Sequence, residues 1–145
     1  MATSEQLRDL TEKQVAWLEG ELKKSQARRH VFVLSHFPVD ERVRNTIGQG
    51  REQVERLLKQ YRPTAYLCGH RHFYAYHDLN ASLHLVCNDL CWSGDNGYVI
   101  YHIFPDHVLA CYKAVGEGRY WRVRFPNPRG REWLSQPQMN ADERR

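Results

Sequence analysis

The chain has 145 residues, 41% of them hydrophobic and 26% charged. These proportions are typical of a single globular domain and exclude the disordered class. Its net charge of +4 comes mostly from arginines near expected helix ends and in a polar C-terminal segment, so charge alone does not indicate a nucleic-acid partner. No window approaches the roughly 20 apolar residues of a membrane span, and no signal peptide is recognisable. By default, we expect a cytoplasmic protein without a membrane partner.

The four cysteines are Cys68, Cys87, Cys91 and Cys111. They are too few and too scattered for the disulfide framework of a small secreted domain. The C-x3-C pair of Cys87 and Cys91 could bind zinc, but the sequence has no second cysteine pair to complete a four-ligand site. We therefore favour two buried thiols at these positions.

The first predicted element is a helix that begins after Thr11. Thr11 can cap the amide of Gln14 while the Gln14 side chain reaches back, which is the pattern of a capping box. Trp17 lies at the edge of the apolar face of this helix, and we expect it to pack. The apolar face itself consists of Val15, Leu18 and Leu22.

A strand, a helix and a second strand follow. Residues 31–34 form a continuous apolar run that predicts a strand buried on both faces of a sheet, and residues 64–68 predict another. Between them, apolar residues at helical spacing predict a helix that ends before Pro63. These residues are Val54, Leu57, Leu58 and Tyr61. A βαβ unit of this kind places its two strands parallel in one sheet.

The remaining strands are predicted to be antiparallel. We expect them at residues 73–77, 83–87, 98–104 and 108–113, with the last two joined as a hairpin at Pro105 and Asp106. Residues 1–125 are interpreted as one domain, and residues 126–145 as a polar, flexible tail.

Three histidines follow the two parallel strands. His36 comes directly after the first strand, and His70 and His72 come after the second. Because the carboxyl ends of parallel strands meet at one edge of the sheet, these imidazoles should converge there. Gly69 should let the backbone turn sharply before His70. Neutral imidazole binds zinc, manganese, iron and nickel, so the sequence predicts a metal site at this edge.

Three motifs in this order resemble the C-terminal part of the calcineurin-like metallophosphoesterases. They are Leu10-Thr11-x-x-Gln14-x-x-Trp17-Leu18, His36-Phe37-Pro38 and Gly69-His70-Arg71-His72. The resemblance runs from about Leu10 to Lys113. It implies an α/β fold that is the C-terminal half of a four-layer αββα sandwich, with a βαβ unit followed by antiparallel strands.

The resemblance also implies roles for these residues. His36 and His70 would bind one divalent transition metal (Mn, Fe, Zn or Ni), and His72 would bind its neighbour in a dinuclear centre. Such a centre hydrolyses a phosphomonoester or a phosphodiester. Arg71 could contact the substrate phosphate through its guanidinium, or it could be a solvated residue at a loop tip.

The motifs that supply the rest of such a site are absent. D-x-H, G-D-x-x-D and G-N-H-[DE] do not occur, and the carboxylates of Asp40, Asp78, Asp89 and Asp95 fit none of them. Two dications about 4 Å apart repel by roughly 16 kcal/mol at an effective dielectric of about 20, so neutral histidines cannot hold such a pair. We assign no catalytic residue. We expect the chain to be inactive or weak alone, completed by a missing N-terminal half or by a homodimer partner.

Two alternatives remain open. The chain could be a non-catalytic interaction or oligomerisation module whose histidines are remnants, or, less favoured, a basic nucleic-acid binder. The other histidines should face solvent or cap turns; they are His30, His77, His84, His102 and His107. The tyrosines of the expected strands should pack across them.

Overall fold

The computed structural model describes residues 8–43, 46–71, 74–79, 82–86, 96–116 and 120–127. These ranges contain two helices and seven strands. In chain order they are α1 (Glu12–Lys24), β1 (Phe32–Leu34), α2 (Arg51–Tyr61), β2 (Ala65–Cys68), β3 (Ala75–Leu79), β4 (Ser82–Val86), β5 (Gly97–Ile103), β6 (His107–Ala114) and β7 (Tyr120–Pro126).

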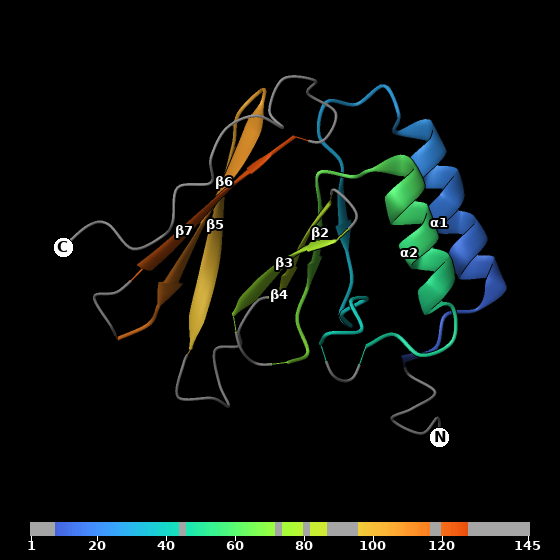
Figure 1. Cartoon of the computed structure of the whole chain (residues 1–145), viewed down its shortest axis with the longest axis horizontal. Helices are drawn as coiled ribbons and strands as arrows, with labels where there is room; N and C mark the ends of the chain where they lie inside the picture. The colour runs from blue at the N-terminus through green and yellow to red at the C-terminus, as the bar shows by residue number, and fades with distance from the viewer. Residues whose placement is uncertain are drawn as a thin grey trace.

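The elements form three layers. The first sheet has the strand order β1-β2-β4-β3, and the second has the order β5-β6-β7. Figure 1 shows α1 and α2 on one side of the first sheet and the second sheet on the other. The fold is mixed α/β with parallel and antiparallel strands, as predicted for half of an α/β sandwich.

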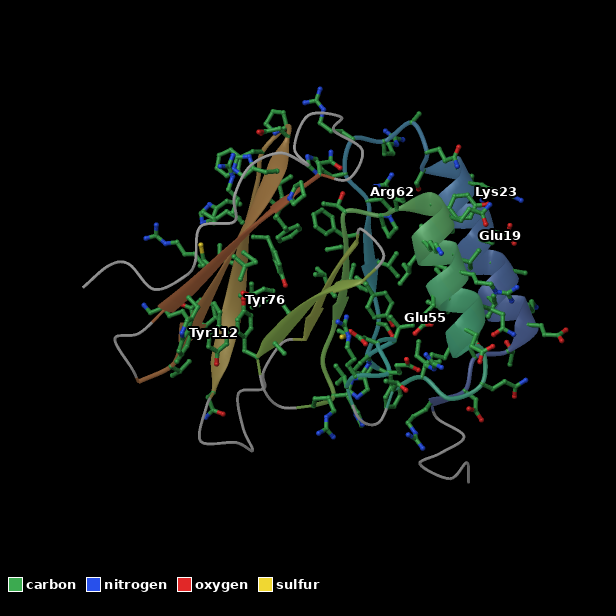
Figure 2. All side chains as sticks on the ribbon, viewed as in Figure 1. Glu19, Lys23, Glu55, Arg62, Tyr76 and Tyr112 are labelled. Carbon is green, nitrogen blue, oxygen red and sulfur yellow. The ribbon has the colours of Figure 1, made fainter. Side chains whose placement is uncertain are left out.

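Helix α1 begins as its sequence predicts. Thr11 and Gln14 form both bonds of the capping box, and Leu22 is buried with Val15 and Leu18 packed beside it. The prediction for Trp17 is wrong, because its side chain is 65% exposed. Trp17 lies about 100° around the helix from the apolar face, and α2 covers only that face. Figure 2 labels Lys23 and Glu19, which form an ion pair along α1.

Helix α2 packs its predicted apolar face into the core. Val54, Leu57, Leu58 and Tyr61 are all buried. The helix ends at Arg62, which adopts the left-handed conformation (φ 48°) and donates its amide to the carbonyl of Leu58. That conformation and the following proline end the helix where the sequence predicts.

Strands β1 and β2 are parallel, which confirms the βαβ prediction. Thr64 fixes the start of the pair: its amide donates to the carbonyl of Val31 at 2.7 Å, and its hydroxyl accepts from the Val31 amide at 3.1 Å. Burial of β1 on both faces was predicted wrongly, because Leu34 is 76% exposed. β1 is an edge strand of the described sheet, and the second sheet does not cover its carboxyl end.

Strands β3 and β4 are antiparallel to each other, as predicted. β4 also pairs in parallel with β2, which was not predicted. The chain leaves β2, forms β3 at the far edge of the sheet, and returns as β4 between them. A local hydrophobic pattern identifies a strand but not its neighbour in the sheet.

The second sheet contains the predicted hairpin and one further strand. β5 and β6 pair antiparallel, and the Phe104 amide closes the turn on the carbonyl of His107 at 2.9 Å. β7 pairs with β6 and was not predicted as a strand. Its inward residues Val123 and Phe125 alternate with Arg122 and Arg124, which is a period-two signal over only four residues.

Apolar side chains join the two sheets. Ala65 of β2 packs with Val108, Ala110 and Phe125 of the second sheet. Asn127 is also buried there, at the start of the predicted tail, and its side chain donates to the carbonyl of Arg29 at 2.6 Å. The rest of that predicted tail lies outside the described residues.

Candidate functional site

The loops after β1 and β2 are bonded to each other. The Ser35 amide donates to the carbonyl of Leu67 at 2.9 Å, and the Gly69 amide donates to the carbonyl of His36 at 3.1 Å. These bonds continue the parallel pairing past the ends of both strands. They place the residues that follow β1 and β2 at one edge of the first sheet, as the βαβ topology requires.

The imidazoles of His36 and His70 meet at this edge. Nε2 of His36 lies 3.2 Å from Nδ1 of His70, and the two ring centroids are 5.1 Å apart. The ring of Phe37 contacts both, at centroid distances of 4.8 Å from His36 and 4.5 Å from His70. The predicted convergence of these two histidines is therefore present in the structure.

Backbone strain at the site lies at His70. Its φ of 68° is in the left-handed region, whereas Gly69 does not have a positive φ. The prediction that Gly69 makes the sharp turn is therefore wrong, because His70, the next residue, has the positive φ. Histidine is among the non-glycine residues that enter this region more often than most, and such outliers gather at functional sites.

Tyr66 supports the site from the core. Its side chain is 1% exposed, and its hydroxyl donates to the carbonyl of Phe37 at 2.8 Å. Burial raises the pKa of this hydroxyl well above its ordinary value, against the opposing effect of a hydrogen bond with Ser35. Sequence reasoning missed this role because Tyr66 has the pattern of an ordinary core residue.

The spacing of the two rings is suitable for one metal ion. Two metal–nitrogen bonds of about 2.0–2.1 Å at a tetrahedral angle separate their nitrogens by about 3.3–3.4 Å. The measured separation is 3.2 Å. A hydrogen bond between one protonated and one unprotonated nitrogen fits the same distance, so protons and a metal ion compete for this pair.

Within the described ranges, no group of three or more histidine, cysteine or acidic side chains is placed to hold a metal ion. Asp40 follows His36 by four residues and is 2% exposed, but Arg42 binds its carboxylate. The Nε atom of Arg42 lies 2.9 Å from both carboxylate oxygens, and one terminal nitrogen lies 2.6 Å from Oδ2. Asp40 does not replace the missing carboxylate ligands unless Arg42 is displaced.

His72, which was predicted as a metal ligand, lies outside the described residues. So do Cys87 and Cys91, which were predicted to be buried thiols, and the carboxylates Asp89 and Asp95. Arg71 is described: it follows His70, its Nε atom is buried, and its amide donates to the carbonyl of Gly69 at 2.8 Å. The roles predicted for His72 and Arg71 stay predictions.

His107 caps a turn, as predicted. It stacks on Phe104 at a centroid distance of 4.4 Å and bonds to Asp106 at 2.8 Å. That hydrogen bond lowers the pKa of the Asp106 carboxyl. His102 is exposed, as predicted, whereas both ring nitrogens of His30 are buried.

No helix among the described residues is long and apolar enough to cross a membrane.

Fold and site together define a two-sheet α/β protein with a pair of contacting histidines at the carboxyl edge of its parallel strands. No family model and no curated protein matches the chain in sequence. One similar solved structure is described as "GAP50 the anchor in the inner membrane complex of Plasmodium". It is 16% identical with a TM-score of 0.69, and the match covers 80% of this chain and 42% of that one.

Two structures of Vps29 from Entamoeba histolytica also match, one of a single mutant and one of the wild type complexed with zinc. Both are 14% identical over 57% of this chain and 51% of theirs, with TM-scores of 0.41 and 0.38. Those scores are too low to carry an argument. The likeness to GAP50 shows a shared fold alone, over less than half the length of that chain.

Proposed function

We propose that this chain provides histidine ligands to the metal centre of a phosphoesterase of the calcineurin-like type. The contact between His36 and His70 at the carboxyl edge of β1 and β2 is the observation that carries the proposal. His72 would serve a neighbouring ion, and Arg71 would bind the substrate phosphate. The substrate would be a phosphomonoester or a phosphodiester.

A divalent Mn, Fe, Zn or Ni ion, when bound, would act as a Lewis acid on a phosphoryl oxygen. The chain's own contribution is positional. Tyr66 fixes the carbonyl of Phe37, the Gly69 amide fixes the carbonyl of His36, and the strained backbone of His70 directs its ring toward His36.

Carboxylate ligands would come from outside the described residues, either from a separate polypeptide or from a second copy of the chain. The exposed carboxyl end of β1 supports this part of the proposal. Leu34 lies there with 76% of its surface exposed, two residues before His36. An edge strand with an exposed leucine is a place where another strand can pair.

Hydrolysis of 4-nitrophenyl phosphate and bis(4-nitrophenyl) phosphate, with added Mn²⁺, tests the proposal. We expect slow, metal-dependent turnover that is lost in His36→Ala and in His70→Ala. His102→Ala is the matched control, because it removes an exposed histidine from the second sheet. Turnover that is independent of metal, or that survives both site substitutions, would contradict the proposal.

A non-catalytic interaction module is the second candidate. It is favoured by the presence of only two converging histidines in the part of the chain described here and by the exposed apolar residue at the edge of β1. Complete absence of metal-stimulated hydrolysis, together with stable self-association or partner binding, would select this function instead.

A further inference from the structure

The second sheet has one face that the described layers do not cover. Side chains alternate across a strand, and Val99 of β5, Ala110 of β6 and Val123 of β7 point toward the first sheet. The intervening residues therefore form an outer face. Its described members include Tyr98, Ile100 and His102 on β5, His107, Leu109, Cys111 and Lys113 on β6, and Arg122, Arg124 and Pro126 on β7.

The centre of this outer face is apolar. Ile100 is 47% exposed and lies directly opposite Cys111. Leu109 and Cys111, on the central strand, are half-buried, and Tyr98 at the edge is exposed. An antiparallel sheet face in contact with water normally carries polar residues at such positions. Grouped apolar side chains with a polar rim mark a contact surface.

The rim of the outer face is basic. Arg122 lies opposite Cys111, and Arg124 lies opposite Leu109; both arginines and Lys113 are exposed. The described members of this face include no carboxylate. Asp106, at the hairpin turn, forms an ion pair with Arg124 at 3.9 Å and a hydrogen bond with His107 at 2.8 Å. A terminal nitrogen of Arg124 also lies 3.4 Å from Nδ1 of His107.

We propose that the outer face binds an acidic amphipathic helix of another protein. A helix is the element that covers the apolar face of a sheet in layered folds, and acidic residues beside its apolar row complement the arginine rim. The inference goes beyond the proposed phosphoesterase function and does not depend on His36 or His70.

Other occupants fit this surface less well. A second copy that packs through the same face would place its cations against these cations. Nucleic acid stacks on aromatic side chains, whereas the centre here is Ile100, Leu109 and Cys111. Residues 128–145 carry four arginines and three carboxylates, so their net charge does not complement a basic rim.

A titration of the full chain, followed by NMR of its backbone amides, tests the proposal. The probe is a synthetic helical peptide with a row of leucines flanked by glutamates, and its control replaces every glutamate with lysine. We expect the acidic peptide to shift amide signals of β5, β6 and β7, with an affinity that falls as salt is raised. The lysine peptide should bind at least about tenfold more weakly.

Three variants locate the contact. Ile100→Glu and Arg122→Glu should each weaken the acidic peptide by about tenfold or more. Lys13→Glu is the matched control for Arg122→Glu, because it makes the same charge change on exposed α1, and it should leave the affinity unchanged. Unfolding in urea should show all three variants folded, since the substituted side chains are exposed.

The proposal would be overturned by absence of amide shifts in the second sheet or by equal binding of the two peptides. Equal weakening by Lys13→Glu, or self-association that Ile100→Glu abolishes, would overturn it as well. Tighter binding of single-stranded nucleic acid than of the acidic peptide to this face would also overturn it and assign the surface to that partner.

Discussion

The ring of His70 is held beside His36 by a backbone conformation that side chains rarely adopt. A non-glycine residue in the left-handed region costs about 1–3 kcal/mol and persists only where its surroundings determine it. Here the Gly69 and Arg71 amides both bond within the loops, to the carbonyls of His36 and Gly69. The G-H pair in the sequence predicts a sharp turn, but local pattern does not say which of the two residues takes the positive φ.

Two glycines should differ in their tolerance of a methyl group. A Cβ on Gly97 would overlap the hydroxyl of Tyr112, and that ring is 3% exposed and stacked on Tyr74 at 4.3 Å. Gly97→Ala should therefore destabilise the fold by about 1–3 kcal/mol. Gly69→Ala is the matched control, because no atom lies within 4 Å of its added Cβ.

Unfolding in urea measures both variants. A loss in Gly97→Ala with little change in Gly69→Ala is the expected pair of results. Equal losses would contradict the account, since they would show that the backbone at Gly69 does require glycine.

At the scale of elements, β2 supports the loop after β1 through a buried hydroxyl. The folded protein holds the Tyr66 proton more tightly than the unfolded chain, because burial raises the pKa of this tyrosine. Its contribution to stability is present below the unfolded pKa of about 10 and is lost as pH rises further.

Tyr66→Phe tests this pH dependence. The urea midpoint of the wild type should fall as pH rises above about 10, and that of the variant should fall less. At neutral pH the variant should lose about 0.5–1.5 kcal/mol, because the Phe37 carbonyl loses its donor. Midpoints that decline in parallel at alkaline pH would show that Tyr66 does not cause the loss.

Helices and the first parallel pair could be predicted from sequence, because their signals are local. The Thr11 capping box and the spacing of Val54 and Tyr61 need no knowledge of distant residues. The insertion of β4 beside β2 and the addition of β7 to β6 could not, because strand order depends on which surfaces meet in three dimensions. The same limit hid the role of Tyr66, whose partner is 29 residues away.

At the scale of the whole molecule, one side chain ties the second sheet to the strand that leads to the site. Asn127 follows β7, is 1% exposed and donates to the carbonyl of Arg29 just before β1. Its own amide donates to the carbonyl of Asp106 at 2.9 Å. The two sheets should therefore open together.

Asn127→Ala should remove about 0.5–1.5 kcal/mol of stability, because the carbonyl of Arg29 loses its donor. Hydrogen exchange measures the effect strand by strand. Slowly exchanging amides of β1 and β6 should accelerate by a similar factor, since their protection reflects one unfolding event. Acceleration in β6 alone would mean that the second sheet opens independently.

The pairing of His36 and His70 could be predicted from the order of the elements, whereas completion of the site could not. Two neighbouring parallel strands place the residues that follow them at the same edge of the sheet, regardless of the rest of the fold. The remaining ligands depend on groups beyond the described residues.

Cobalt(II) binding, followed by visible absorption, tests most directly the claim that His36 and His70 share a metal ion. The account predicts saturable binding to the full chain that weakens at least about tenfold in His36→Ala and in His70→Ala. His102→Ala should bind as the wild type does. Binding that survives both site substitutions, or that falls equally in His102→Ala, would contradict the central claim.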